Sequence, residues 1–334
     1  MSIVKNNLLL IPGVVFLFVV GLIGRYIGGY IPYVSYLIVC IFIGLIISNT
    51  CGLPTLVEKG VKATHKVWLE AGIMVLGARV ILKELVDMGP TLLLIVAFFL
   101  LFYLAVTQFL SNLFGLDERF GSTLACGLGV CGVSAVTATG GALQIKPKDL
   151  AYIIGVVLVF DVFTVFAWPL IGSIFAMPSE IFGPWAGVSM LSTGTAVAAG
   201  FAHSDTAGEL AAIVKMARNA TIGIWALAFT AYYANKGLTQ EVTNKTAYLW
   251  DKFPKFVLGF LAVMILSNIG VLSTQQVISM ENAYGWLFMA AFVGLGYDIK
   301  IGELRKTGIK PLIVALISVT LVSVLSLSIL YVLR

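Results

Sequence analysis

Three ionisable side chains lie inside strongly apolar stretches of this chain. Asp161 falls in the run VVLVFDVFTVFAWP, and Lys215 and Arg218 fall in the run AAIVKMARNATIGIW. Ionisable residues at membrane depth are costly and usually functional, so all three are candidates for chemistry. Asp161 could bind and release a coupling proton or cation. The alternative is a structural carboxylate that pairs with a neighbouring helix.

Lys215 and Arg218 are three residues apart, which places them on one face of a helix. Two cations at this spacing could neutralise a small oxyanion, because an ammonium supplies charge and a guanidinium supplies a fork of donors. Two other interpretations stay open. The side chains could form an ion pair with Asp161, or they could extend toward lipid headgroups.

Two glycine-rich stretches, at about 121–143 and 184–203, supply short polar side chains. Helix N-termini carry partial positive charge, so hydroxyls and free amides at interrupted helices suit an anion. The alternative is that the hydroxyls only cap the interruptions. The predicted ion-coupling residue is Asp161. The predicted substrate-binding residues are Cys131, Gly132, Ser134, Thr137, Ser189, Ser192, Thr193, Thr195, Lys215 and Arg218.

The composition of the chain indicates that these residues lie in a protein embedded in a membrane. The chain is 60% hydrophobic and 11% charged, whereas soluble domains are about 45–50% apolar and about 25% charged. Glycines weaken a continuous helix, and irregular backbone persists in lipid only where protein buries it or where it lines a watery cavity. Two such stretches indicate a solute site in the middle of a secondary transporter.

Apolar runs of nearly 20 residues predict eleven helical segments, at about 8–24, 33–49, 67–83, 89–112, 121–143, 150–176, 184–203, 207–235, 254–271, 284–299 and 309–332. We expect one all-α transmembrane domain over residues 1–334, with nine to eleven spans. No nucleotide, metal or catalytic motif is present, so we expect no cofactor and no enzymatic activity. The net charge of +5 implies no nucleic-acid partner, because the basic residues cluster in short loops.

An internal repeat relates residues at about 31–93 to residues at about 250–312, with a constant offset of 219 positions. The matched pairs are Ser48-Asn49 with Ser267-Asn268, Leu76-Gly77 with Leu295-Gly296, Glu84-Leu85 with Glu303-Leu304, and Gly89 with Gly308. One pair changes sign, because Asp298 aligns with Arg79. With this number of helical segments, the two blocks cross the membrane in opposite orientations, as the repeats of secondary transporters do.

The distribution of lysine and arginine predicts a cytoplasmic N-terminus, because the loops on the N-terminal side hold most of them. If the two glycine-rich stretches re-enter rather than cross, Lys146 and Lys148 join that side and the excess grows. Re-entry also puts the stretches on opposite faces of the membrane, as an in-plane two-fold axis requires. A hairpin of about 22 residues is tight, however, and both arrangements stay open. His65 lies among basic residues and is expected to be solvated.

Several runs resemble the YeiH family of proposed sulfate exporters, namely LACGLGVCGVSAVTATGGAL, GPWAGVSM, TAVAAG, VKMAR and FPKFVLGFLAVMILSNIG. The resemblance covers nearly the whole chain. It implies the wider bile acid, arsenite and riboflavin transporter group, with inverted repeats, discontinuous helices and elevator-type movement in a bacterial inner membrane. Family members commonly carry a His-Asp pair where this chain has Leu191 and Ser192, so Asp161 is the substitute for any proton role of that pair.

We therefore expect a secondary active transporter of a small anion, such as sulfate, another sulfur oxyanion or a sulfonate, coupled to protons or sodium. The alternative is a cation/proton antiporter on the same fold, in which Lys215 pairs with Asp161. A passive channel and a membrane enzyme have less support, because interrupted helices favour alternating access and no catalytic set converges. A homodimer follows by analogy with elevator transporters.

Overall fold

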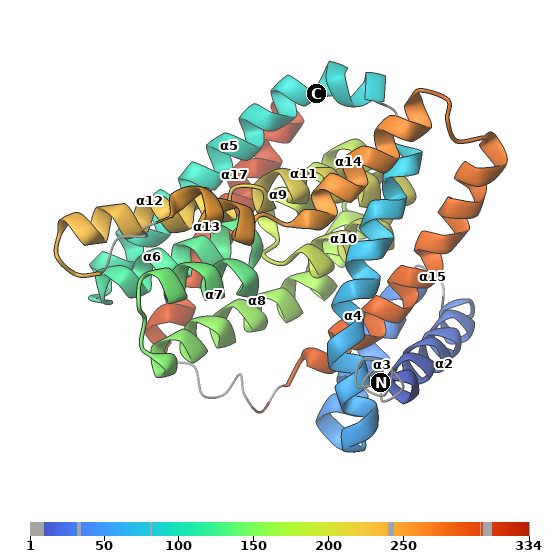
Figure 1. The fold of residues 1–334 in the computed structure, drawn as a ribbon, viewed down its shortest axis with the longest axis horizontal. Helices are drawn as coiled ribbons and strands as arrows, with labels where there is room; N and C mark the ends of the chain where they lie inside the picture. The colour runs from blue at the N-terminus through green and yellow to red at the C-terminus, as the bar shows by residue number, and fades with distance from the viewer. Residues whose placement is uncertain are drawn as a thin grey trace. The chain divides into compact units, whose positions relative to one another are not determined.

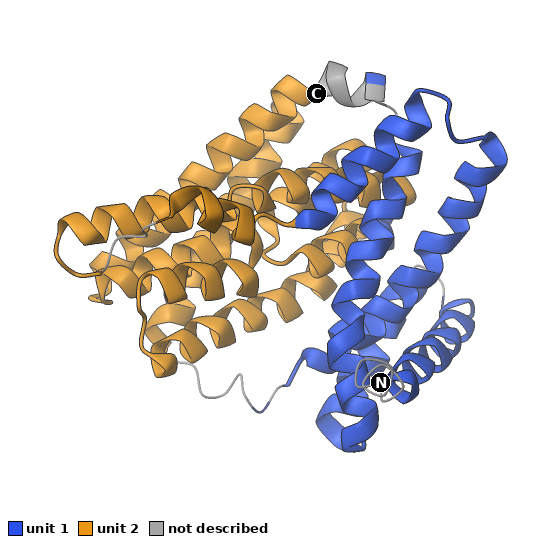
Figure 2. Cartoon of the chain, viewed as in Figure 1, with its two compact units in different colours: residues 1–87, 201–203, 255–302 blue, residues 88–200, 204–254, 303–334 orange. Residues whose placement is uncertain are grey.

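The computed structural model describes residues 10–31, 35–80, 82–239, 244–300, 302 and 309–333. Within these residues the only regular structure is helical and no strand forms, and Figure 1 shows the helices from α2 to α17. Contacts divide the chain into two compact units, which Figure 2 colours separately. Unit 1 comprises residues 1–87, 201–203 and 255–302, and unit 2 comprises residues 88–200, 204–254 and 303–334.

Five helical stretches among the described residues are long and apolar enough to cross a bilayer, which requires about 20 apolar residues. The shorter helices α3 (Tyr36–Thr50) and α14 (Lys255–Asn268) are also apolar. The chain is therefore an all-helical, multi-pass membrane protein, as its composition predicted. The five stretches are Ile11–Gly28, Gly89–Leu113, Pro147–Ile174, Asp205–Asn235 and Ile309–Val332.

Unit 1 is built on close packing of α15 (Thr274–Asp298) along α3 and α4 (Thr55–Leu76). Gly72 of α4 leaves room for the ring of Phe288 of α15, because a Cβ at Gly72 would lie only 2.5 Å from that ring. Such close packing fixes how the helices sit against one another within this unit. The other described elements of unit 1 are α2 (Ile11–Gly28), a 3-10 turn at Gly77–Arg79, and α14.

Two asparagines of unit 1 make equivalent long-range hydrogen bonds. Asn49 Nδ2 in α3 donates to Ile299 O at 2.8 Å, and Asn268 Nδ2 in α14 donates to Val80 O at 2.8 Å. The two donors are 219 positions apart in the sequence, and so are the two acceptors. The contact is therefore reciprocal, because each stretch supplies the donor to one bond and the acceptor to the other.

The aligned residues of opposite sign also make equivalent contacts in unit 1. Arg79 Nη1, in the 3-10 turn that follows α4, lies 2.6 Å from Glu281 Oε1 and donates to Tyr284 OH at 2.9 Å. Asp298 Oδ2, at the end of α15, lies 3.0 Å from His65 Nε2. His65 and Tyr284 are themselves 219 positions apart. Arg79 and Asp298, which have opposite charges, therefore contact residues at matching positions of the repeat, and these partners differ in type, tyrosine in one case and histidine in the other.

The structure corrects one expectation in this region, because His65 is enclosed rather than solvated. The side chain is 3% exposed. Its Nδ1 lies 3.0 Å from Val61 O, and its Nε2 faces Asp298. Helix α4 turns this face toward α15, and the basic residues near His65 in the sequence gave no sign of that.

Unit 2 holds every residue that the sequence predicted for the site. Glu303, Leu304 and Gly308, which the repeat also pairs, lie outside the described residues. The elements are the greater part of α5 (Leu82–Leu113), α6 (Glu118–Cys126), η2 (Gly127–Cys131), α7 (Val133–Ala142), α8 (Pro147–Ile174), α9 (Ser179–Ser189), the greater part of α10 (Thr193–His203), α11 (Asp205–Asn219), α12 (Ile222–Asn235), α13 (Lys245–Lys252) and α17 (Ile309–Val332).

Candidate solute site

Two helices of unit 2 are interrupted where the sequence is rich in glycine. The first passes through one π-helical turn, η2, and restarts as α7 after Gly132, whose φ of 67° suits glycine. The second ends as α9 at Ser189 and restarts as α10 at Thr193. Each interruption frees carbonyls at the end of one helix and amides at the start of the next.

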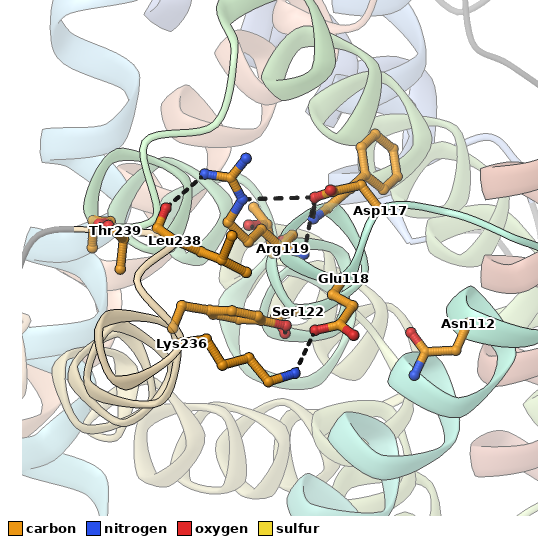
Figure 3. Close-up of polar contacts among 12 residues, drawn as sticks. Asn112, Asp117, Glu118, Arg119, Ser122, Lys236, Leu238 and Thr239 are labelled. Atoms are coloured by element: carbon orange, nitrogen blue, oxygen red, sulfur yellow. Dashed lines mark hydrogen bonds and ion pairs between the residues drawn. The ribbon is translucent and has the colours of Figure 1, made fainter.

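Both ends of the first interrupted segment reach the turn that follows α12, and Figure 3 shows the contact at the start of α6. At the start of α6, Glu118 Oε2 lies 2.8 Å from Lys236 Nζ. At the end of α7, Ala142 O accepts a hydrogen bond of 3.1 Å from Thr239 Oγ1. Because Lys236 and Thr239 are neighbours in one turn, α6 and α7 form a hairpin with its base at this turn.

The second interrupted segment closes on itself in the same way. Ser179, the first residue of α9, lies 2.7 Å from the hydroxyl of Ser204, which directly follows α10. Ser204 also caps α11, accepting from Ala207 N at 3.0 Å. The helices α9 and α10 therefore form a second hairpin.

The two hairpins touch at their tips. A Cβ built on Gly132 would lie 3.3 Å from Ser192 Cβ and would overlap Ser192 Oγ. Gly132 is the N-cap of α7, and Ser192 is the N-cap of α10. Two helix N-termini, each with partial positive charge, therefore converge at one point. This arrangement favours a bound anion.

Arg218 of α11 satisfies carbonyls at both interruptions. Its side chain is 1% exposed, and its three nitrogens donate to backbone oxygens at 2.5–2.9 Å. The last carbonyls of a helix lack intrahelical partners, and the helix dipole also favours a cation there. The acceptors are Leu128 and Gly129 in the first segment and Gly187, Val188 and Met190 in the second.

Lys215, one turn earlier on α11, has the same role. It is fully enclosed, and its Nζ donates to Val130 O at 3.1 Å, to Met190 O at 2.9 Å and to Leu191 O. An ammonium has three donors, and three carbonyls use them. Lys215 and Arg218 thus share one helical face, as predicted, and their hydrogen bonds go to the backbone. Neither forms an ion pair with Asp161 among the described residues.

Asp161 of α8 lies on the first turn of α10. Its carboxylate accepts from Ser192 N at 3.0 Å, from Thr195 Oγ1 at 2.9 Å and from Ser192 Oγ. This is the chemistry of a helix N-cap, supplied here from another helix. Asp161 is 4% exposed, so the charged side chains that unit 2 encloses in the described residues are Asp161, Lys215 and Arg218, one negative and two positive.

The remaining predicted hydroxyls divide into enclosed and open ones. Ser189 is enclosed, donates to Trp185 O at 2.6 Å and accepts from Trp168 Nε1 at 2.7 Å, so its hydroxyl is occupied by protein groups. Ser134 and Thr137 are exposed on the first turns of α7. Thr137 Oγ1 donates back to Ser134 O at 3.0 Å and keeps its lone pairs open.

Thr193 and Cys131 lie beside the tips. Thr193 Oγ1, on the first turn of α10, accepts from Asn219 Nδ2 at 2.8 Å. Cys131, the residue before Gly132, is 6% exposed.

Sequence reasoning missed Tyr103 and Trp168. Tyr103 OH donates to Ser189 O at 2.9 Å, and its ring centroid lies 5.6 Å from the Arg218 guanidinium. A buried tyrosine or tryptophan usually finds a partner for its polar atom. That rule identifies neither residue in advance, because their apolar runs look like any other membrane helix.

Known proteins resemble this chain over nearly its full length. A family model described as Conserved hypothetical protein 698 matches residues 12–315. A UPF0324 membrane protein of Nitratidesulfovibrio vulgaris is 33% identical over 312 residues, which cover 90% of this chain and 86% of that protein. A UPF0324 membrane protein of Clostridium tetani is 28% identical over 328 residues, 94% of each chain. These matches confirm the family resemblance that the sequence motifs indicated.

Proposed function

Because the chain belongs to the Conserved hypothetical protein 698 family of membrane proteins, the YeiH-like proteins, we propose that it is a secondary active transporter of a small anion. One observation carries the proposal. The N-caps Gly132 and Ser192 meet where unit 2 encloses two cations and one carboxylate. An anion at the tips would bind first-turn amides and would be favoured by the positive balance of enclosed charge.

The anion would contact exposed polar groups at the tips. Ser134, Thr137, Ser192 and Thr193 are all partly or fully exposed there, and of these the hydroxyls of Thr137 and Ser192 donate to Ser134 O and to Asp161. The donors of Lys215 and Arg218 go to carbonyls, so these two residues would act on the anion through their charge. Cys131, Gly132, Ser189 and Thr195 would shape the tips. Sulfate, other sulfur oxyanions and sulfonates are the substrates that the family resemblance favours.

Asp161 would couple anion movement to a proton or a sodium ion. Its carboxylate lies on the first turn of α10 and accepts from Ser192 and Thr195. A proton or cation taken up there would remove a negative charge close to the anion. The anion would then bind more tightly, and release of the coupling ion would release it.

The hairpin bases support re-entry of both glycine-rich segments from opposite membrane faces. Glu118 and Ala142 reach the same turn, and Ser179 meets Ser204. Re-entry puts Lys146 on the N-terminal side, so the positive-inside rule favours a cytoplasmic N-terminus in a bacterial inner membrane.

The division into units supports elevator movement, in which unit 2 carries the anion and unit 1 is the scaffold. Every candidate residue lies in unit 2. The reciprocal bonds of Asn49 and Asn268 in unit 1 support an inverted repeat across residues 31–93 and 250–312. A homodimer would give the scaffold further area in the bilayer. We expect no enzymatic activity and no cofactor.

A cation/proton antiporter is the second candidate, and one observation favours it. The ammonium of Lys215 lies among three carbonyl oxygens, which are also ligands for a monovalent cation. Lys215 and Asp161 bind separate backbone and hydroxyl groups, whereas this mechanism would pair them. That separation favours the anion transporter.

Charge movement in proteoliposomes distinguishes these functions. Sulfate, sulfite, thiosulfate, small sulfonates and small carboxylates would be added rapidly to wild type, with sodium and pH varied. A saturable current with one of these anions supports the proposal. Currents on sodium or pH jumps alone would favour the antiporter, and currents that do not saturate would favour a channel.

A further inference from the structure

The amide of Asn219 has an unused polar atom beside the N-terminus of α10. Asn219 is the last residue of α11 and is 2% exposed. Its Nδ2 donates to Thr193 Oγ1 at 2.8 Å, which holds the amide against the first turn of α10. Its Oδ1 is buried and has no hydrogen-bond partner. Buried polar atoms are nearly always paired, so this acceptor calls for an explanation.

The same helix turn offers donors. The first amides of α10, at Thr193 and the two residues after it, precede the intrahelical bonds, which begin when Ala196 N donates to Ser192 O at 3.1 Å. Asp161 accepts from Ser192 and Thr195, whereas Asn219 lies at Thr193. A ligand at this turn would therefore meet amide donors together with one neutral acceptor.

We propose that Asn219 determines which anions the site accepts, by taking a hydrogen bond from a donor group on the anion itself. This inference rests on the proposed function and names its substrate class. The anion carries an O–H or N–H group next to its charged oxygens, as in a singly protonated oxyanion, a hydroxysulfonate or a hydroxycarboxylate. Its charged oxygens bind the first amides of α10, and its donor binds Asn219 Oδ1.

The choice of an amide at this position is physically consistent with an anion. A carboxylate at position 219 would also accept the bond but would cancel the positive balance that Lys215 and Arg218 create. An apolar side chain would leave the donor of the ligand unpaired. A ligand with a donor gains a hydrogen bond to the buried acceptor, whereas the analogue that lacks the donor leaves Asn219 Oδ1 as unpaired as it is in the free protein.

Pairs of anions that differ by one donor test the inference. Isethionate would be compared with ethanesulfonate, and glycolate with acetate, through the ligand-induced rise in melting temperature of detergent-purified protein. We expect wild type to bind the member with the hydroxyl at least tenfold more tightly. Asn219→Leu should lose that preference by weakening only the hydroxylated member, and Asn219→Asp should bind both members more weakly.

Two further variants keep the test interpretable. Thr193→Val removes the bond that orients the amide and should reduce the preference. Asn112→Ala, at an exposed amide on α5, should leave it unchanged. If Asn219→Leu does not fold, the wild-type preference still decides.

The outcomes separate this inference from the proposed function. If wild type binds one of these anions but binds both members of each pair equally, the inference about Asn219 is wrong and the transporter proposal stands. A preference for the members without a hydroxyl would also overturn it. If wild type neither binds nor transports any small anion, the proposed function itself fails.

Discussion

The two hairpins of unit 2 have matching carbonyl ends and different amide ends. At the carbonyl ends, Lys215 and Arg218 donate to the first hairpin and to the second. At the amide ends, α7 starts at Gly132 with no side-chain cap hydrogen bond, whereas α10 starts at Ser192 with the Asp161 carboxylate on its first turn. The shared carbonyl ends hold the two tips together, and the differing amide ends set the charge and polarity that a solute at the tips would meet.

The comparison of the two ends shows what the two buried cations, Lys215 and Arg218, do in the structure: both bind the carbonyl ends of the hairpins. A buried cation in a transporter is easily taken as a direct ligand for an anion. In this chain the donors of both cations bind carbonyls, so their effect on an anion would come from charge alone. Direct contact would come from exposed groups at the tips, such as Ser134 and Thr193.

The largest expected effect comes from breaking the shared carbonyl ends. Arg218→Leu removes donors from carbonyls of both hairpins, and each buried unpaired carbonyl costs about 1–3 kcal/mol. The sum is comparable with a total stability of about 5–15 kcal/mol, so the variant should fail to fold or melt far below wild type. Thermal unfolding in detergent, followed by size-exclusion chromatography, measures this.

Arg119→Leu is the matched control for that experiment. Arg119 donates to Leu238 O at 3.0 Å at the base of the first hairpin (Figure 3), and its side chain is 28% exposed. We expect a loss below about 1 kcal/mol for it. Equal stability of Arg218→Leu and Arg119→Leu would contradict the structural role of Arg218.

A smaller but specific effect is expected from separating the tips. Gly132→Ala places a Cβ into Ser192 Oγ, at a φ of 67° and a ψ of −134°, a backbone conformation that is nearly restricted to glycine and costs another residue about 1–3 kcal/mol. The protein should fold, and the anion-dependent current should fall at least tenfold. Gly141→Ala, which meets no atom within 4 Å, should keep its current. A normal current in Gly132→Ala would show that the tips need not touch.

The asymmetry of the amide ends is tested by Asp161→Asn. An asparagine oxygen can still accept from Ser192 N, so the fold should persist while the negative charge is lost. We expect anion binding to tighten severalfold and the current to lose its dependence on pH or sodium. Titrations of the anion current at several pH values and sodium concentrations measure both. An unchanged coupling-ion dependence would remove Asp161 from that role.

The smallest effects are expected in unit 1, where the ion pairs of Arg79 and Asp298 differ in burial. Glu281→Gln weakens a partly exposed pair with Arg79 and should cost about 0–1 kcal/mol. Asp298→Asn weakens the contact with the enclosed His65 and should lower the free energy of unfolding by more than Glu281→Gln does. Melting temperatures of the two variants give the order, and the reverse order would contradict the account of His65.

The sequence predicted an all-helical membrane protein and singled out the candidate residues, because both depend on local composition. Apolar runs set the helices, and Asp161, Lys215 and Arg218 stood out as charges within such runs. The partners of these residues could not be predicted. Every residue carries a backbone carbonyl, and the sequence does not indicate which carbonyls lack a partner within a helix. Only the folded chain shows that the carbonyls near Val130 and Met190 are in this state. The enclosed contact between His65 and Asp298 escaped prediction for the same reason, since it depends on packing between helices.

The central claim is that a small anion binds between the two hairpin tips. The most direct test is protection of single cysteines, Ser134→Cys in the first hairpin and Thr193→Cys in the second, on a background with the exposed Cys51 replaced by serine. The anion that gives the largest current should slow maleimide labelling at both positions with one half-saturating concentration, and it should leave Ser328→Cys on α17 unaffected. Unchanged labelling at both tips, with the current intact, would contradict the account.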